Sequence, residues 1–117
     1  MKTTNILLAE KAKLIFETIA SMAVHSKMHR SIHSSINRKI EILRLNFQYG
    51  DPIAKNLIPK IYSDELGITN LFRIELPSFW RMLYTVRQGQ TETEIDVLII
   101  DILDHKEYDG KFGYKRK

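Results

Sequence analysis

The chain has 117 residues, of which 44% are hydrophobic and 27% charged, a composition typical of a single soluble globular domain. It has no cysteine, which excludes disulfide scaffolds, thiolate zinc sites and cysteine nucleophiles, and which is compatible with a reducing cytosol. Its 18 Lys and Arg residues outnumber 14 Asp and Glu residues, so the net charge of +4 and the pI near 9.4 weakly favour a polyanionic partner.

The N-terminal part of the sequence has the periodicity of two amphipathic helices. A short strand is expected first, at residues 2–6. Apolar residues then recur at spacings of three and four from about residue 8 to 24, and again from about 29 to 47. The turn-forming pair Asp51-Pro52 follows, so we expect a helical hairpin over about residues 8–47.

The next segment, residues 48–70, has no clear period and contains two prolines and two glycines. It predicts an ordered loop with one helical turn near residues 63–66, capped by Ser63. A loop of this length in a compact domain is uncommon unless it has a function.

Strands are expected over residues 71–104. Alternating apolar and polar residues predict one strand at 72–76 and another at 80–87, in which Trp80, Met82, Tyr84 and Val86 face the core. Residues 95–103 are apolar on both faces, as in a central strand covered on both sides. Residues 105–117 would form a basic tail.

These elements predict one α+β domain spanning residues 1–117, with an N-terminal helical hairpin packed on one face of a small, mostly antiparallel sheet. The second face of that sheet would carry Arg73, Glu75 and Arg81, because these residues alternate with the core positions beside them.

The order of elements and several short motifs resemble the RelE/ParE superfamily of type II toxin–antitoxin toxins. The stretch Trp80-Arg81-Met82-Leu83-Tyr84 is similar to that family's paired middle strands, and His105-Lys106-Glu107-Tyr108 to its last strand and C-terminal tail. The likeness covers nearly the whole chain in element order. It implies a RelE-like fold and either ribosome-dependent mRNA cleavage, as in the RelE/YoeB-like branch, or gyrase poisoning, as in the ParE-like branch.

The resemblance implies four catalytic candidates. Arg81 matches the phosphate-binding arginine, and a planar, permanently charged guanidinium suits a phosphorane; otherwise it is a surface arginine paired with Glu75. His105 can protonate the leaving oxygen. Asp51 resembles a glutamate that precedes a proline and is the proposed base in YoeB-like members, although aspartate is one methylene shorter and Asp-Pro is also an ordinary turn. Tyr108 would stack on or orient the nucleotide.

Basic and aromatic residues supply candidates for RNA contacts, which would be salt-dependent and independent of sequence. Arg73 is the best placed, because it shares the exposed strand face with Arg81. The other candidates are Lys55, Lys60, Lys106, Lys111 and Tyr114, followed by the terminal Lys115, Arg116 and Lys117.

Three histidines, His25, His29 and His33, are spaced four apart and would share one face of a continuous helix. The hydrophobic pattern breaks inside this stretch and no carboxylate is near, so we expect a solvated helix start and no metal site. No cofactor is expected either.

The sequence thus predicts a toxin that cleaves mRNA on the ribosome without a metal, with mRNA, rRNA and an antitoxin protein as partners. Alternatives are a ribosome-binding factor of the same fold that does not cleave, a gyrase poison, and a structural module. No apolar run approaches the roughly 20 residues that span a bilayer, and charges at Glu10, Lys11 and Lys13 interrupt the N-terminal apolar stretch. We therefore expect a cytoplasmic protein without a membrane partner.

Overall fold

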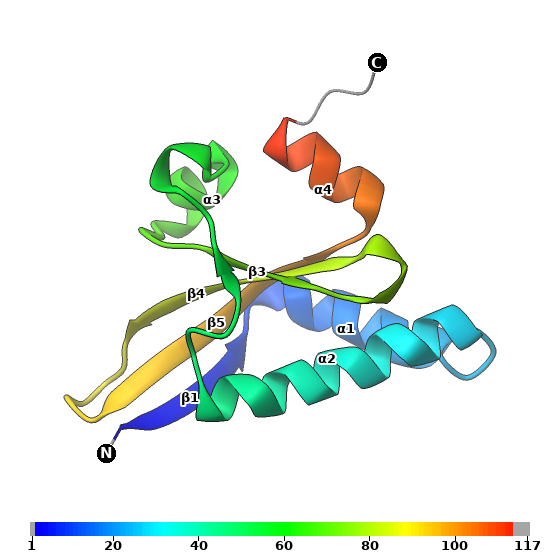
Figure 1. Ribbon diagram of the computed structural model, residues 1–117, viewed down its shortest axis with the longest axis horizontal. Coiled ribbons are helices and arrows are strands. Elements are labelled where there is room, and N and C mark those ends of the chain that lie inside the picture. The colour runs from blue at the N-terminus through cyan, green and yellow to red at the C-terminus, as the bar shows by residue number, and fades with distance from the viewer. Residues whose placement is uncertain (1, 114–117) are drawn as a thin grey trace.

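A five-stranded sheet in the order β1-β5-β4-β3-β2 forms the centre of the protein in the computed structural model, which describes residues 2–113. Over these residues the chain forms five strands, four α-helices and two short 3-10 helices (Figure 1). In chain order the elements are β1 (Thr3–Leu8), α1 (Glu10–Met22), α2 (Lys27–Leu45), β2 (Asp51–Pro52), η1 (Lys55–Leu57), α3 (Lys60–Leu66), β3 (Phe72–Glu75), η2 (Pro77–Phe79), β4 (Arg81–Gln88), β5 (Glu94–Leu103) and α4 (His105–Phe112).

The sheet is mixed, because β1 runs parallel to β5 while the other three strand pairs are antiparallel. The α+β class predicted from the sequence is therefore confirmed. The chain begins with a strand that extends to Leu8, so the first helix starts at Glu10 and not at residue 8. No helix among residues 2–113 has both the length and the apolarity needed to cross a bilayer.

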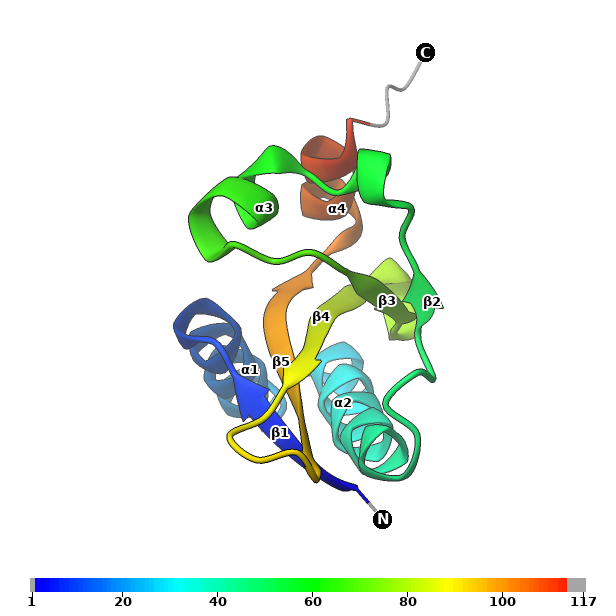
Figure 2. The same cartoon turned by 90° about the vertical axis from the view of Figure 1, so that its left-hand side faces the viewer.

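One face of the sheet packs against α1 and α2 (Figure 2). The apolar residues that recur along the two helices are buried together with the inward-facing residues of β3, β4 and β5, as their periodicity predicts. This core contains Ala12, Ile19, Ile32, Ile36, Leu43, Ile74, Leu76, Met82, Tyr84, Val97, Ile99 and Ile102. Trp80 and Val86 pack against it, so the predicted inward face of the strand at residues 80–87 is confirmed.

The second face of the sheet is covered over part of its area by α3 and α4 (Figures 1 and 2). A second core lies there, formed by Tyr62, Leu71, Leu83, Ile100, Leu103 and Tyr108. β5 contains a β-bulge: Leu83 pairs with Asp101 while Tyr84 pairs with Ile99, which leaves Ile100 as the extra residue. β5 contributes to both cores, with Val97, Ile99 and Ile102 in the first and Ile100 and Leu103 in the second.

Two segments differ from the expectation. The 48–70 segment contains β2, η1 and α3, and α3 begins at Lys60, directly after Pro59, so Ser63 lies inside the helix and does not cap it. Residues 105–112 form α4 and not a tail, because Asp104 and Glu107 make a capping box at the helix start.

A buried polar network ties α3 and α1 to the centre of the sheet. The Asp101 carboxylate is 1% exposed and accepts hydrogen bonds from the Tyr62 hydroxyl at 2.7 Å and the Lys11 ammonium at 3.0 Å. Burial, followed by the hydrogen bond to Asp101, raises the pKa of Tyr62 well above its usual value. A buried carboxylate is tolerated here because its charge is paired and its oxygens are hydrogen-bonded.

Candidate functional site

Two arginines from neighbouring strands converge on one tyrosine of α4. The Arg73 Nη1 atom donates a hydrogen bond to the Tyr108 hydroxyl at 3.0 Å. The Arg81 guanidinium carbon lies 5.1 Å from the centroid of the same ring, and that of Arg73 lies 5.9 Å from it. Because both arginines are on the sheet face opposite Ile74 and Met82, the predicted alternation of these strands places them together.

Asp51 joins this cluster through strand register. It pairs with Arg73 across β2 and β3, and its Oδ2 atom lies 3.7 Å from the Arg73 Nη2 atom. The Asp51 side chain is 70% exposed, whereas that of Arg73 is 29% exposed. Such an ion pair at the surface is weak, so the Arg73 guanidinium is free to exchange Asp51 for another anion.

Positive charge dominates at the centre of the cluster. The Arg81 Nη1 atom donates hydrogen bonds to the main-chain carbonyls of Phe79 and Trp80. Glu75 lies opposite Arg81 in the strand register, but Arg81 makes no ion pair with a carboxylate within residues 2–113. The Nε atoms of Arg73 and Arg81 are both buried and have no hydrogen-bond partner among the described residues. Buried donors of this kind normally have an acceptor, which an anion such as phosphate would supply.

The pKa of Arg73 is raised, because the hydrogen bond to Tyr108 raises it by more than burial lowers it. The Tyr108 ring itself is buried, 2% exposed, and stacks on Phe112 with centroids 4.4 Å apart. Its faces are therefore covered, and its hydroxyl serves to orient Arg73. The expected stacking of Tyr108 on a nucleotide does not fit this arrangement; the structure shows the Tyr108 hydroxyl in contact with Arg73.

His105 is the first residue of α4, one helical turn before Tyr108, so both side chains share one side of the helix. Its Nε2 atom lies 3.3 Å from the Oδ2 atom of Asp109, which holds the imidazole in place. The side chain is 44% exposed, and its ring centroid is 5.8 Å from that of Phe79. The accessible imidazole of His105 thus lies beside the η2 turn, whose Phe79 carbonyl accepts a hydrogen bond from Arg81.

That turn has a backbone conformation that L-residues seldom adopt. Ser78 and Phe79 have φ values of 60° and 63°, in the left-handed region. Each such residue costs about 1 to 3 kcal/mol and persists only where its surroundings impose it. The turn aims the Phe79 carbonyl at Arg81 and leaves the Phe79 side chain 70% exposed. Phe79 was not among the sequence-based candidates, because nothing in Pro-Ser-Phe signals an exposed ring.

Tyr84 is a second residue that the sequence did not reveal as part of the site. Its hydroxyl accepts a hydrogen bond from the Gly50 amide at 2.8 Å and donates one to the Phe47 carbonyl at 3.0 Å. A Cβ atom on Gly50 would lie 2.8 Å from the Tyr84 ring, so only glycine fits there. Tyr84 thereby fixes the chain just before Asp51. The alternation of β4 had indicated only that Tyr84 faces the core.

The remaining RNA-contact candidates among the described residues lie on η1, α3 and α4. Lys55 is in η1 and Lys60 begins α3, both exposed, while Lys106 and Lys111 are on α4. Tyr114 and the three residues after it lie outside the described part of the chain.

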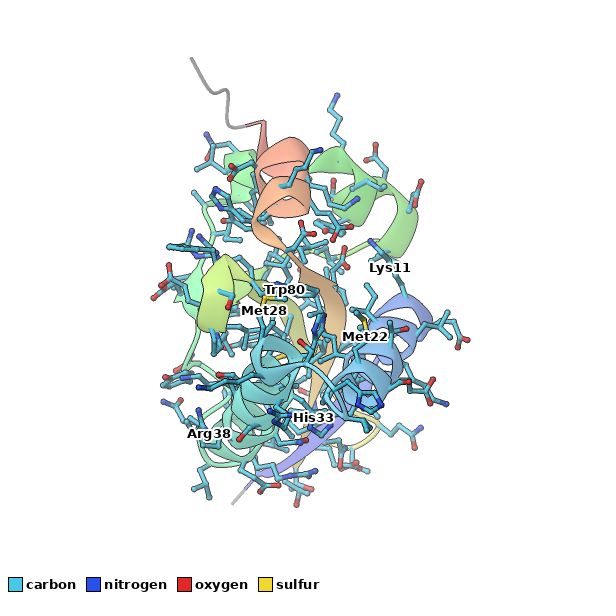
Figure 3. All side chains as sticks on the ribbon, turned by 90° about the vertical axis from the view of Figure 1, so that its right-hand side faces the viewer. Lys11, Met22, Met28, His33, Arg38 and Trp80 are labelled. Atoms are coloured by element: carbon cyan, nitrogen blue, oxygen red, sulfur yellow. The ribbon has the colours of Figure 1, made fainter. Side chains whose placement is uncertain are left out.

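The three spaced histidines lie in a turn and on α2. His25 is in the turn between α1 and α2. The Nδ1 atom of His29 lies 2.7 Å from the Ser26 hydroxyl oxygen, and the His29 ring is edge-on to Trp80. His33, which is labelled in Figure 3, stacks on Phe16. Among residues 2–113, no group of three or more histidine and carboxylate side chains is arranged to hold a metal.

Comparisons with known proteins give no relative from which to assign this site. No family model matches the sequence, and neither the curated proteins nor the solved structures include a match. The functional argument therefore rests on the arrangement of the residues themselves.

Proposed function

We propose that the protein is a toxin of a type II toxin–antitoxin system, of the RelE/YoeB-like branch of the RelE/ParE superfamily, that cleaves mRNA on the ribosome. The observation that carries the proposal is the convergence of Arg73 and Arg81 on Tyr108, with buried unpartnered Nε atoms and with His105 one turn away. The two guanidinium groups can bind and stabilise a phosphate, and the imidazole beside them can donate a proton, which are two functions that phosphodiester cleavage uses.

In the proposed reaction the 2′-oxygen of a ribose attacks the adjacent phosphorus, and the bond from phosphorus to the 5′-oxygen breaks. Arg73 and Arg81 bind the phosphate oxygens and stabilise the negative charge that grows on them in the phosphorane. Protonated His105 gives its proton to the departing 5′-oxygen. The products are a 2′,3′-cyclic phosphate and a free 5′-hydroxyl. Tyr108 acts as a positioning residue that holds Arg73 by the hydrogen bond described above.

Asp51 would accept the proton of the 2′-hydroxyl. In the structure its carboxylate is paired with Arg73, so it becomes available as a base when Arg73 turns to the substrate phosphate. The same residue supports the second candidate function, a factor that occupies the ribosome without cleaving. If the Asp51 carboxylate stays paired with Arg73, no base is available, and the site would bind RNA and not cut it.

The exposed lysines of η1, α3 and α4 extend the positive surface beyond the site and would contact rRNA or mRNA phosphates. Such a protein would act in the cytoplasm, where its substrate is, and its activity would be held in check by an antitoxin protein. These partners follow from the proposed membership of the superfamily.

The test is single-turnover cleavage of mRNA on programmed ribosomes by wild type and by the Arg81→Ala, Arg73→Ala and His105→Ala variants. Each substitution should slow cleavage on the order of a hundredfold, as expected for loss of a charge-stabilising or acid group. Arg87→Ala is the matched control, because Arg87 is on the same strand as Arg81 but is 57% exposed and paired with Asp96.

Cleavage by wild type with unchanged rates in all three variants would place the active site elsewhere. Ribosome binding without cleavage by wild type would select the non-cleaving factor. A protein that neither binds ribosomes nor cleaves would contradict both functions.

A further inference from the structure

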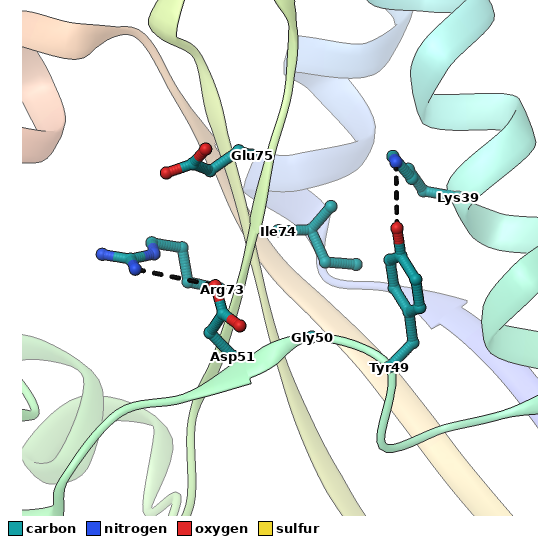
Figure 4. Close-up of a pocket in the computed structure, with 7 residues that line it drawn as sticks. All are labelled: Lys39, Tyr49, Gly50, Asp51, Arg73, Ile74 and Glu75. Carbon is teal, nitrogen blue, oxygen red and sulfur yellow. Dashed lines mark hydrogen bonds and ion pairs between the residues drawn. The ribbon is translucent and has the colours of Figure 1, made fainter.

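A polar pocket of about 340 Å³ lies at the outer edge of β3, next to the arginine cluster (Figure 4). Lys39 of α2 and Tyr49, from the loop before β2, line one side, and Asp51, Arg73 and Glu75 line the other. The Lys39 ammonium donates a hydrogen bond to the Tyr49 hydroxyl at 3.1 Å and lies 5.3 Å from the ring centroid. The Tyr49 side chain is held in place, yet Tyr49 remains 42% exposed.

The pocket also contains the open edge of a strand. The Ile53 amide donates a hydrogen bond to the Leu71 carbonyl at 2.9 Å, so the main-chain groups of Leu71 point toward β2. In an antiparallel ladder every second residue of a strand points its amide and carbonyl to the same side. The main-chain groups of Arg73 and Glu75 therefore point to the same edge as those of Leu71. Arg73 is paired with Asp51 there. The chain leaves the sheet before Tyr49 could pair with Glu75, because the Tyr49 amide bonds the Asn46 carbonyl in a turn.

The Glu75 amide and carbonyl therefore face the pocket side by side. One donor beside one acceptor matches the hydrogen-bonding edge of a nucleobase, and the neighbouring Tyr49 ring offers a face for stacking. A peptide strand fits this edge poorly, since the next residue that would face it, Pro77, has no amide N–H and begins the η2 turn. Lys39 lies where it can bind a phosphate of the same nucleotide.

We propose that this pocket holds one nucleobase of a single-stranded RNA, stacked on Tyr49 and bonded to the Glu75 main chain, beside the phosphate bound by Arg73 and Arg81. The inference rests on the proposed function for the identity of the ligand as RNA. The pocket would be a second subsite, on the other side of β3 from the two guanidinium groups. The RNA would then cross the edge of the sheet at β3. Lys39 and Tyr49 become residues that position the substrate and do not take part in proton transfer.

The experiment uses two readouts on the full chain. The first is cleavage on programmed ribosomes, as a rate and as a distribution over codons. The second is the affinity for a fluorescent single-stranded RNA hexamer at low salt, measured by anisotropy. The variants are Tyr49→Ala, Tyr49→Phe, which keeps the ring, and Lys39→Gln. Leu45→Ala is the control, because Leu45 is 92% exposed and lies outside the pocket.

We expect Tyr49→Ala to weaken hexamer binding about tenfold and to change the codon distribution, because a stacking face is lost. Tyr49→Phe should bind the hexamer more tightly than Tyr49→Ala, because the ring is kept. Leu45→Ala should stay within about twofold of wild type, and Lys39→Gln should reduce the salt dependence of binding. Circular dichroism and thermal melting would verify that each variant is folded.

The outcomes separate this inference from the proposed function. If wild type cleaves and Tyr49→Ala cleaves the same codons at the same rate with unchanged hexamer affinity, the nucleobase pocket is wrong and the function stands. If wild type never cleaves, cleavage on the ribosome is wrong, and the hexamer alone decides the pocket: loss of affinity in Tyr49→Ala supports it. Absent or Tyr49-independent hexamer binding overturns it.

Discussion

The hydroxyl of Tyr84 and the amide of Gly50 lie 2.8 Å apart, and this single hydrogen bond anchors the start of β2 to the middle of β4. Asp51 is the next residue, and its pairing with Arg73 depends on where Gly50 is held. The geometry of the candidate site is thus set from inside the core, by a phenol that is fully buried.

Gly50→Ala should lower the free energy of unfolding by about 1 to 3 kcal/mol, because the new methyl group would overlap the Tyr84 ring and overpack a tight site. Urea unfolding followed by circular dichroism measures this change. The matched control is Gly110→Ala, since a Cβ at Gly110 of α4 meets no atom of the described residues within 4 Å. That variant should gain about 0.5 to 1 kcal/mol, as alanine favours a helix over glycine. Equal effects of the two substitutions would argue against the close contact at Gly50.

Stability should fall at high pH partly through Tyr84. Desolvation raises the pKa of Tyr84 to about 12, against a value of about 10 in the unfolded chain. A raised pKa in the folded state means that stability is fully present below pH 10 and is lost as the pH rises toward 12. A shift of this size amounts to about 2 to 3 kcal/mol over that window.

The measurement for Tyr84 is the slope of unfolding free energy against pH between 10 and 12, in wild type and in Tyr84→Phe. The variant lacks the ionisable hydroxyl, so its slope should be shallower even though it is less stable at neutral pH. Parallel slopes in the two proteins would show that Tyr84 is not the group responsible.

Ser78→Gly should raise the free energy of unfolding by about 1 kcal/mol, because glycine adopts the left-handed conformation of Ser78 without the steric cost. Ser78 is exposed, so no packing is lost with its side chain. Thermal melting detects the gain. A lower melting temperature would mean that the Ser78 side chain makes a contact that stabilises the fold by more than the relief of backbone strain does.

Asp51→Glu should retain or raise the cleavage rate on programmed ribosomes, since the longer side chain brings its carboxylate nearer to a substrate bound at Arg73. Asp51→Asn keeps the size of the side chain but removes its basicity, and it should slow cleavage by about a hundredfold. If both variants cleave like wild type, another group accepts the proton and Asp51 only pairs with Arg73. Hexamer affinity, measured alongside, separates an effect on binding from one on chemistry.

The sequence predicted well those features that depend on period alone. Alternation in β3 and β4 placed Arg73 and Arg81 on one face, opposite Ile74 and Met82. The helical stripes identified the helical residues of the first core, which are Ala12, Ile19, Ile32, Ile36 and Leu43. The bulge at Ile100 could not be foreseen, because a single extra residue leaves an apolar run looking continuous.

The sequence holds local signals for one helix that was not predicted, α4, and for the full length of α3, which was predicted only as a turn near residues 63–66. Asp104 and Glu107 have the spacing of a capping box, which marks residues 105–112 as a helix even though basic residues dominate the tail that follows. Pro59 and Gly67 bracket α3 in the positions where helices start and stop. The contacts of Tyr84 and Tyr108 arise from tertiary packing, for which a single sequence holds no signal.

The pairing of β1 with β5 has a consequence for biosynthesis. Thr3 lies beside Glu94 and Leu8 beside Ile99, so β1 has no neighbouring strand in the sheet until β5 has been synthesised. Closing so long a loop is entropically costly, and sheets built on such distant contacts fold slowly. A nascent chain that lacks β5 also lacks α4, and hence both His105 and Tyr108. Any activity that depends on these two residues is therefore withheld until β5 and α4 have left the ribosome.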